Sequence, residues 1–314
     1  MNILITGGTG LIGSALATSL AQDGNQVTIL SRNPQKNSDQ LPSGVKVVQW
    51  DGRTAEGWGQ LVDGADVLVN LAGESIAGES LSALIFKRWT PERRGRLLTS
   101  RVDAGHAILE AIQKAQVKPA VLVQASAVGY YGSRGDEELA EDTSAGDDFL
   151  ARICTAWEAS TAPVEALGVR RIIIRSPGVV MSLKGGAFPF MLLPFKLFVG
   201  GPLGGGKQWF SWIHIKDEVK AIRFLIDNPQ ASGAFNLVAP HATTNADFSK
   251  ILSKVLGRPY WFPVPAFALK LLFGAKAAIL LVSTRQIPKR LQEIGFVFDF
   301  PTAQQAFADL LQKK

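Results

Sequence analysis

Cysteine is almost absent from this chain of 314 residues, and Cys154 is the single one. One thiol excludes the internal disulfide framework that stabilises small secreted domains. The first residues also show no basic segment and no small-residue cleavage site of a secretory signal. Both absences fit a reducing compartment, and we expect a cytoplasmic protein.

Histidine is nearly as scarce, with only His106, His214 and His241. No cluster of cysteine, histidine and acidic residues accompanies His214 at the spacing of metal ligands, so no metal site is predicted. A lone histidine of this kind is interpreted as a structural hydrogen-bonding residue.

Long uncharged apolar runs are missing as well. A membrane-spanning helix needs about 20 nearly uncharged residues, whereas the two most apolar stretches, Phe188–Val199 and Pro265–Val282, each contain lysine. We therefore expect no integral membrane segment. Within the second stretch, Ala266–Val282 is predicted to form an apolar helix that packs in the core or at a subunit interface.

What the chain does contain is globular in composition, with 46% hydrophobic and 19% charged residues. A length of 314 residues suits one large α/β unit, or a nucleotide-binding domain with a smaller one appended. The net charge of +6 permits anionic ligands. A phosphorylated cofactor suffices as that ligand, so no nucleic-acid partner is predicted.

The first thirteen residues carry the central motif. A short apolar run, Asn2–Thr6, leads into three glycines, Gly7, Gly10 and Gly13, and a segment of helical composition follows as far as Gln22. A strand that turns on glycines into a helix gathers backbone N–H groups and the positive end of a helix dipole at one point. Glycine is needed there because a Cβ would block the approach of a pyrophosphate or the packing of helix on strand. The motif predicts a phosphate site.

Strand-like and helical segments then alternate along the chain. The further strand candidates are Gln26–Leu30, Val45–Trp50, Asp66–Asn70, Ala120–Gln124 and Arg170–Arg175. This rhythm is typical of an α/β protein with a parallel sheet covered on both faces. From about Pro177 the rhythm loosens into glycine-punctuated loops that we expect to wall a pocket. A helix capped by Asp217 and a strand at Ala234–Val238 are predicted beyond them.

The end of the second strand candidate indicates which dinucleotide binds. An acidic residue at this point would accept a hydrogen bond from a ribose 2′-hydroxyl, whereas Ser31-Arg32 suits a 2′-phosphate. The sequence therefore favours NADP(H) over NAD(H), against the alternative of a solvated arginine at a strand end. Leu71, Ala72 and Gly73 follow another strand candidate, at the sheet edge where such a cofactor lies.

A basic segment begins at Lys87 and is predicted to continue as a long helix to about Ala115. Such a run is usually a solvated helix face. Arg96 and Arg101 could instead turn toward cofactor phosphates. The rotation of the helix relative to the sheet decides between these alternatives, and the sequence does not supply it.

Three hydroxyl-bearing residues follow the strand candidate Ala120–Gln124. Ser126, Tyr130 and Tyr131 stand where they could hydrogen-bond a substrate carbonyl or hydroxyl, and they are the candidate catalytic residues. The alternative is that Ser126 satisfies a local backbone group and the tyrosines pack.

Several motifs together carry a resemblance to a known family. They are Gly7–Gly13, Ser31-Arg32, Asn70–Glu74, Lys87–Trp89, Ser100-Arg101, Tyr130-Tyr131, Trp157-Glu158, Gly200–Gly204, Gln208–Ile215, Phe235–Leu237 and Ile287–Leu291 with Gly295-Phe296. In these the chain resembles the atypical extended short-chain dehydrogenase/reductases called epimerase family proteins. These are relatives of nucleotide-sugar epimerases and include a cell-division-inhibitor-like group with a small C-terminal module.

The resemblance implies a Rossmann-type doubly wound sheet in residues 1–176 and a smaller α/β substrate-binding domain and C-terminal module in residues 177–314. Parts of 205–240 are expected to return to the first domain. It also implies bound NADP(H). The matching cofactor residues are Gly7, Thr9, Gly10, Leu11, Ile12, Gly13, Ser31, Arg32, Leu71, Ala72, Gly73, Glu74, Arg96, Arg101 and Val180.

One departure from the family pattern concerns catalysis. Working short-chain dehydrogenases carry Tyr-x-x-x-Lys on the helix after the serine strand, and the lysine lowers the tyrosine pKa. The corresponding residues here are Cys154 and Glu158. A glutamate would make a neighbouring phenol harder to ionise.

Two functions follow from the sequence. The first is an NADP(H)-dependent oxidoreductase or epimerase, acting on a small and sugar-like substrate, in which Ser126 polarises a substrate oxygen and Tyr130 or Tyr131 transfers the proton. The second is a non-catalytic NADP(H)-binding sensor or scaffold, with the Ala266–Val282 helix as a partner or membrane-surface contact. A monomer or a homodimer fits either function.

Overall fold

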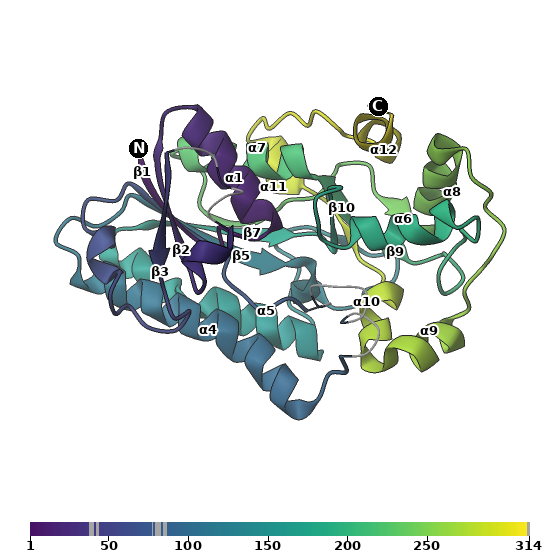
Figure 1. The fold of residues 1–314 in the computed structure, drawn as a ribbon, viewed down its shortest axis with the longest axis horizontal. Helices are drawn as coiled ribbons and strands as arrows, with labels where there is room; N and C mark the ends of the chain where they lie inside the picture. Colours follow the sequence, from purple (N-terminus) through teal and green to yellow (C-terminus); the bar gives the residue numbers. More distant parts are fainter. Residues whose placement is uncertain (38–40, 42–43, 77, 79–82, 84–86, 313–314) are drawn as a thin grey trace.

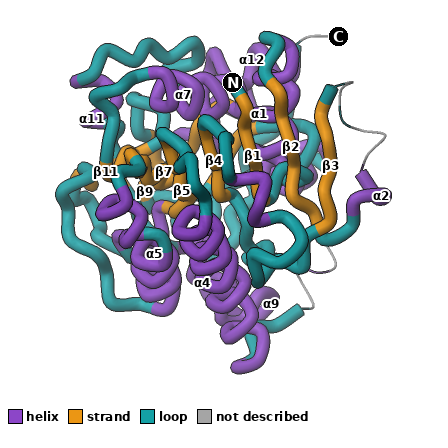
Figure 2. The backbone as a smooth tube through the Cα atoms, turned by 90° about the vertical axis from the view of Figure 1, so that its left-hand side faces the viewer, coloured by secondary structure: helices purple, strands orange, loops and turns teal. Residues whose placement is uncertain are grey.

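The computed structural model describes residues 1–37, 41, 44–76, 78, 83 and 87–312. Within these residues, seven parallel strands form the central sheet in the order β11-β7-β5-β4-β1-β2-β3 (Figure 2). The strands are β1 (Asn2–Thr6), β2 (Gln26–Ser31), β3 (Val45–Gln49), β4 (Val67–Asn70), β5 (Val121–Ala127), β7 (Arg170–Ser176) and β11 (Gly233–Asn236). The predicted Rossmann-type α/β fold is confirmed.

Helices cover both faces of this sheet. Figure 1 shows α1 (Leu11–Gln22) and α7 (Ile215–Asp227) on one side, and α4 (Pro91–Lys114) and α5 (Phe149–Ser160) on the other. Strand β1 explains why two layers are needed, because Ile3 and Ile5 belong to one buried cluster and Leu4 to another. A strand that is apolar on both faces is stable only between two layers of helices.

The order of the strands creates the place for a ligand. The chain runs outward from β1 to β2 and β3, then crosses back to β4 on the other side of β1. Thr6, at the end of β1, is in register with Leu30 on β2 and with Asn70 on β4. Two connections therefore diverge from the carboxyl ends of neighbouring strands, and this crevice is where open α/β sheets bind ligands.

The remaining elements are short and lie mostly after residue 176. They are α2 (Pro34–Asn37), β6 (Glu138–Leu139), β8 (Val179–Met181), α6 (Phe188–Lys196), β9 (Trp209–Phe210), β10 (Trp212–His214), β12 (Thr243–Thr244), α8 (Asn245–Leu256), α9 (Ala266–Phe273), α10 (Ala277–Leu281), β13 (Arg285–Gln286), α11 (Lys289–Glu293) and α12 (Ala303–Leu311). Short 3-10 turns lie at Gly59–Val62, Val128–Tyr131, Ala162–Leu167 and Gly274–Lys276.

A second core lies in the C-terminal part of the chain. It includes Phe188, Trp212, Phe248 and Phe307. The chain nevertheless returns to the central sheet, because β11 pairs with β7 and α7 packs against β5 and β7. Strand β13 pairs with β6 in a separate two-stranded sheet. The domain boundary after residue 176 stays a prediction, and the two returning elements α7 and β11 lie within residues 205–240.

Two local predictions were wrong. The apolar segment 266–282 is two short helices, because Gly274 at φ +57° ends α9 and a 3-10 turn precedes α10. Helix α7 is capped by His214, whose Nδ1 accepts a hydrogen bond from the Lys216 N–H at 3.1 Å. Asp217 instead accepts hydrogen bonds from the N–H groups of Asp299 and Phe300, which hold the segment before α12.

Among the described residues, no helix has the length and hydrophobicity required to span a bilayer. The same residues contain no group of three or more histidine, cysteine or acidic side chains placed to hold a metal ion.

Candidate functional site

The glycine turn between β1 and α1 packs tightly against backbone atoms at two of its glycines, Gly7 and Gly13. Gly7 has φ +66°, and a Cβ on it would lie 2.5 Å from the carbonyl oxygen of Leu71. A Cβ on Gly13 would lie 2.4 Å from the carbonyl oxygen of Gly7. Both distances are far inside van der Waals contact, so these two glycines allow the strand, the turn and the helix to meet.

Gly10 has a different surrounding. It is the N-cap of α1 and provides no side-chain cap. A Cβ on it would meet only the Gly7 carbonyl oxygen, at 3.2 Å. The N–H groups of the first helical turn, including those of Leu11 and Ile12, have no carbonyl partner within the helix. The turn therefore fits a diphosphate, and a side chain at Gly10 would occupy the space in front of the helix N-terminus.

A pocket of about 280 Å³ adjoins this turn at the carboxyl edge of the sheet. It is lined by residues that follow four of the strands and by residues of α4. The predicted cofactor residues among them are Gly7, Thr9, Ser31, Arg32, Ala72, Gly73, Glu74 and Arg96. The lining residues that the sequence reasoning did not assign to the cofactor are Leu30, Asn33, Trp50, Asp51, Gly52, Arg53, Thr99 and Ser100.

Two guanidinium groups belong to the wall of this pocket near the end of β2. Arg32 and Arg53 are both exposed. Gly52 has φ +84°, and a Cβ on it would lie 3.4 Å from Cδ of Arg32, so the stem of Arg32 runs along the loop after β3. In the described part of the chain, neither guanidinium is paired with a carboxylate. Two unpaired cations beside the open N-terminus of α1 form a pocket suited to a phosphate group.

Asp51 is the acidic residue of this loop. Its carboxylate accepts hydrogen bonds from the N–H groups of Arg53 and Thr54, at 2.8 and 2.9 Å, and from the Thr54 hydroxyl. Slight burial raises the pKa of Asp51, but these hydrogen bonds outweigh it and leave the pKa below its usual value. Asp51 therefore remains ionised and fixes the backbone that presents Arg53. The sequence feature that points to Arg53 as a pocket residue is its position in the loop after β3, which ends at the same edge of the sheet as β2.

Arg96 and Arg101 occupy different environments. Arg96 lines the pocket, is 57% exposed and has its Nε 3.5 Å from Glu74 Oε2. Arg101 is buried, donates to the carbonyl oxygens of Leu97 and Glu74 at 2.8 and 3.0 Å, and lies over the ring of Trp157. Burial lowers the pKa of Arg101. Arg96 therefore belongs to the pocket wall. Arg101 lies outside the wall and binds the backbone of Glu74, in the segment after β4 that lines the pocket.

A chain of polar side chains joins the ends of β1 and β4 to the middle of β5. The Thr6 hydroxyl donates to Asn70 Oδ1 at 2.7 Å, and Asn70 Nδ2 donates to Gln124 Oε1 at 2.9 Å. The Ala72 N–H also reaches Asn70 Oδ1, at 3.3 Å. This chain sets the course of the Leu71-Ala72 segment that passes the glycine turn. Thr6 and Gln124 were missed by the sequence reasoning, because only the strand register brings them together.

Val180 lies on β8, outside the central sheet, where it is in register with Ile213. A Cβ on Gly186 would come within 2.9 Å of the Leu11 side chain and 3.7 Å of the Val180 carbonyl oxygen. The loop after β8 therefore passes the start of α1. Val180 and Leu11 are brought to the same side of the molecule, beyond the residues that line the pocket.

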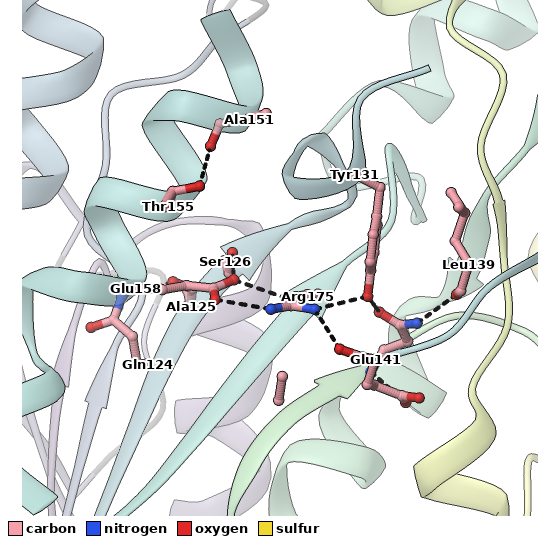
Figure 3. A network of polar contacts seen from close by, with 12 residues as sticks. Gln124, Ala125, Ser126, Tyr131, Leu139, Glu141, Ala151, Thr155, Glu158 and Arg175 are labelled. Atoms are coloured by element: carbon pink, nitrogen blue, oxygen red, sulfur yellow. Dashed lines mark hydrogen bonds and ion pairs between the residues drawn. The ribbon is translucent and has the colours of Figure 1, made fainter. Parts of the chain in front are cut away.

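Ser126, the first candidate catalytic residue, is 4% exposed on β5. Its hydroxyl donates to Oε1 of Glu158 on α5 at 2.6 Å (Figure 3). The carboxylate also receives two hydrogen bonds from Arg175 on β7, at 2.9 and 3.0 Å. Ser126 is thus bonded to an ion pair that joins α5 to the sheet.

Tyr131 belongs to the same network and is wholly buried. Its hydroxyl accepts a hydrogen bond from Arg175 at 3.0 Å (Figure 3). The same hydroxyl donates to Asn236 Oδ1 at 2.7 Å. Burial raises the pKa of Tyr131 to about 12, although Arg175 opposes the rise. The sequence argument made Glu158 the neighbour that hinders ionisation of a phenol. In the structure the cause is burial, and Arg175 lies between the carboxylate and Tyr131.

Tyr130 and Cys154 complete this region. Tyr130 is half-buried, with its ring centroid 3.5 Å from the Arg175 guanidinium, and its hydroxyl has no hydrogen bond among the described residues. Cys154 is buried, and burial followed by the charge of Glu158 raises the pKa of its thiol to about 12. Of the hydroxyls of Ser126, Tyr130 and Tyr131, only that of Tyr130 makes no hydrogen bond to a residue that the structure describes.

Comparison with known proteins finds similarity along most of the chain. The model of the NAD dependent epimerase/dehydratase family matches residues 3–238, and that of a domain of unknown function, DUF1731, matches residues 264–310. The epimerase family protein YfhF of Bacillus subtilis (strain 168) is 37% identical over 314 residues, which cover 99% of this chain and 98% of YfhF.

Two solved structures are similar as well. The crystal structure of human epimerase family protein SDR39U1 (isoform 2) with NADPH superimposes with a TM-score of 0.88 at 34% identity, covering 100% of both chains. That of the nucleoside-diphosphate sugar epimerase from Corynebacterium glutamicum has a TM-score of 0.77 at 34% identity, covering 99% of this chain and 58% of the other.

Proposed function

The chain belongs to the NAD dependent epimerase/dehydratase family, and on that premise we propose that it binds NADP(H) along the carboxyl edge of its sheet. The observation that carries the proposal is that Arg32 and Arg53 both line the pocket beside the N-terminus of α1, which has no side-chain cap. A 2′-phosphate would give these two guanidinium groups a negatively charged partner for hydrogen bonding. The human relative, crystallised with NADPH, supports the same choice of cofactor.

The residues of the pocket divide by the chemistry they offer. The glycine turn would take the diphosphate on backbone N–H groups, and Arg32 and Arg53 would take the 2′-phosphate, with Ser31 and Arg96 beside them. Asp51 would offer its carboxylate to hydrogen-bond donors of the adenosine. Bound NADPH would supply a hydride. An enzyme also needs a side chain that transfers a proton to or from the substrate.

The geometry favours a non-catalytic NADP(H)-binding sensor or scaffold over an enzyme that uses Ser126 and Tyr131. Ser126 donates to Glu158, and Tyr131 is buried between Arg175 and Asn236 with its pKa raised to about 12. A group that shuttles protons near neutral pH needs a pKa close to the working pH and access to the substrate. Tyr131 has neither property.

A second candidate function, an NADP(H)-dependent oxidoreductase or epimerase acting on a small sugar-like molecule, depends on Tyr130. Its hydroxyl is the one without a protein partner in the described part of the region, and its ring lies against the Arg175 cation. In this candidate Tyr130 takes the proton-transfer role and Arg175 is a positioning residue.

Three measurements test these proposals. Nicotinamide fluorescence during titration of the purified protein should show much tighter binding of NADPH than of NADH, and equal affinities would remove the 2′-phosphate assignment. The NADPH-loaded protein is then mixed with a panel of sugars, ketones and quinones while NADPH oxidation is followed. Oxidation that disappears in Tyr130→Phe and persists in Tyr131→Phe supports the oxidoreductase. An epimerase returns the hydride and oxidises no NADPH overall, so the NADP⁺-loaded protein is also incubated with the sugars and their epimers are sought by NMR. No oxidation and no epimer supports the sensor or scaffold.

A further inference from the structure

A group of large apolar side chains is exposed on the C-terminal part of the chain, away from the cofactor pocket. Six of them define what we call the apolar face: Phe198, Trp261, Phe262, Phe267, Leu271 and Leu272. Each is between 47% and 80% exposed. Single exposed apolar residues are ordinary, but a group of this kind marks an interaction surface.

Backbone contacts hold the segments of the apolar face together. Trp261 Nε1 donates to the Phe198 carbonyl oxygen at 2.8 Å, and the N–H groups of Trp261 and Phe262 both reach the Gly200 carbonyl oxygen. The same two segments meet again where the Val264 N–H donates to Pro202 at 2.9 Å. Helix α9 follows directly, at the lower right of Figure 1, and turns only Leu269 into the core. The apolar face is therefore built into the fold.

The two stretches of chain that supply the apolar face carry cations and no carboxylates, and Asp247, at the edge of the second stretch, lies near Tyr260. No aspartate or glutamate occurs between Glu165 and Asp217 or between Asp247 and Glu293, and these two stretches supply the whole face. Lys196, Arg258 and Lys270 are exposed within them. The Arg258 guanidinium lies 4.4 Å from the centroid of the Phe198 ring. Among the described residues, none of these three cations is paired with a carboxylate.

We infer that the apolar face docks on an anionic lipid bilayer as a peripheral contact. Aromatic and leucine side chains enter the boundary between headgroups and acyl chains, and lysine and arginine around them are attracted by acidic headgroups. Trp261 suits that boundary because it combines an apolar ring with a polar N–H. A second copy of this chain is the less favourable occupant, because a two-fold contact would place like charges together with no carboxylate from either stretch to pair with them.

The backbone at Phe198 is a second observation in favour of a functional face. Among the described residues, Phe198 is the only non-glycine residue with a positive φ, at 62°. A bulky side chain in the left-handed region is strained, and such strain gathers at functional surfaces. Here it presents a half-exposed aromatic ring, just after the end of α6, to the Arg258 guanidinium.

The test is co-sedimentation of the full chain with lipid vesicles, either phosphatidylcholine alone or phosphatidylcholine with phosphatidylglycerol. The protein should bind the phosphatidylglycerol vesicles, bind phosphatidylcholine weakly, and dissociate as salt is raised. Leu271→Asp should weaken binding by about tenfold or more, since it removes one leucine from the contact with the acyl chains and adds an anion. Val117→Asp is the matched control, because Val117 is 63% exposed on the loop before β5. NADPH binding by both variants checks that they are folded.

Three results would overturn the inference. One is no binding to phosphatidylglycerol vesicles, and another is equal binding to both kinds of vesicle. The third is a concentration-dependent dimer, seen by analytical ultracentrifugation, that Leu271→Asp dissociates and Val117→Asp does not, because the face would then bind a second copy.

Discussion

Glu158 on α5 and Arg175 on β7 face each other as a buried ion pair, joined by hydrogen bonds of 2.9 and 3.0 Å. Working short-chain dehydrogenases carry a lysine at the position where Glu158 stands in this chain. The chain has therefore reversed the charge on the helix and placed a cation on the neighbouring strand instead. The Arg175 side chain is 5% exposed, and among the described residues Glu158 is the carboxylate that pairs with its charge.

Replacing Glu158 should destabilise the fold strongly. Glu158→Gln keeps the shape of the side chain but leaves Arg175 buried without a counter-charge, which typically costs about 3–5 kcal/mol of unfolding free energy. Urea denaturation measures the loss. Glu165→Gln is the control, because Glu165 is 54% exposed in its pair with Arg171 and its loss should cost less than about 1 kcal/mol. Similar losses in the two variants would show that the buried pair has no special structural role.

Removing either guanidinium from the pocket should weaken NADPH binding selectively. Arg32→Ala removes a charge-assisted partner of the 2′-phosphate worth about 1.5–3 kcal/mol and should leave NADH binding nearly unchanged. Arg53→Ala should act in the same direction. Arg88→Ala removes an exposed arginine that does not line the pocket, and it should change neither affinity. A loss shared equally by NADPH and NADH would mean that these arginines do not recognise the 2′-phosphate.

The glycines of the turn should separate binding from folding. A Cβ on Gly13 would lie 2.4 Å from the Gly7 carbonyl oxygen, so Gly13→Ala should lower the unfolding temperature sharply. A Cβ on Gly10 has a single neighbour, at 3.2 Å, so Gly10→Ala should leave the unfolding temperature of the free protein nearly unchanged. Gly10→Ala should nevertheless weaken binding of both NADPH and NADH, because the methyl group occupies the diphosphate side of the helix N-terminus. Cofactor titration and thermal unfolding of the two variants check this, and unaltered NADPH binding by Gly10→Ala would contradict it.

The parts of the site that the sequence predicted are those encoded within a few residues. The glycine turn and the Ser31-Arg32 pair are local patterns, and both lie at the sheet edge. The environments of Arg96 and Arg101 were left open because they depend on how α4 is rotated against the sheet. The pair of Glu158 and Arg175 was missed, since its members lie on different elements and only the packing of α5 on β7 joins them.

The same distinction between local and long-range information explains the two wrong predictions of secondary structure. Gly274 interrupts the apolar segment 266–282 at φ +57°, and its presence was visible, but hydrophobic composition alone suggested one helix. Asp217 was taken as an N-cap because aspartate favours that position. The structure uses its carboxylate for the N–H groups of Asp299 and Phe300, a long-range contact that no local pattern shows.

Stability should depend on pH through Glu218 at the start of α7. This side chain is wholly buried, its Oε1 accepts a hydrogen bond from Ser176 at 2.5 Å, and burial raises its pKa to about 8. The folded protein then retains a proton that the unfolded chain releases above its ordinary pKa of about 4.5. Stability from this group is therefore present below about pH 4.5 and is lost as pH rises through about 8.

Glu218→Gln tests this dependence, because glutamine resembles the protonated acid and does not titrate. Its unfolding free energy should exceed that of the original chain by more at pH 8 than at about pH 5. Urea denaturation at both pH values measures the difference. Glu110→Gln is the control, since Glu110 is 47% exposed beside Lys114 and should give nearly the same difference at both. If Glu218→Gln changes the unfolding free energy by the same amount at both pH values, the raised pKa of Glu218 is refuted.

Two substitutions at Phe198 should separate backbone strain from lipid docking. Glycine adopts φ 62° freely, whereas alanine keeps the strain of a Cβ in the left-handed region. Both lose the aromatic ring and its contact with Arg258. Phe198→Gly should therefore unfold with a free energy about 1 kcal/mol higher than Phe198→Ala, while both bind phosphatidylglycerol vesicles more weakly than the original chain and to the same extent. Thermal unfolding and vesicle co-sedimentation on the same samples measure the two effects. If the glycine variant binds vesicles as well as the original chain, the ring contributes nothing to docking, and the strained backbone at Phe198 needs another explanation.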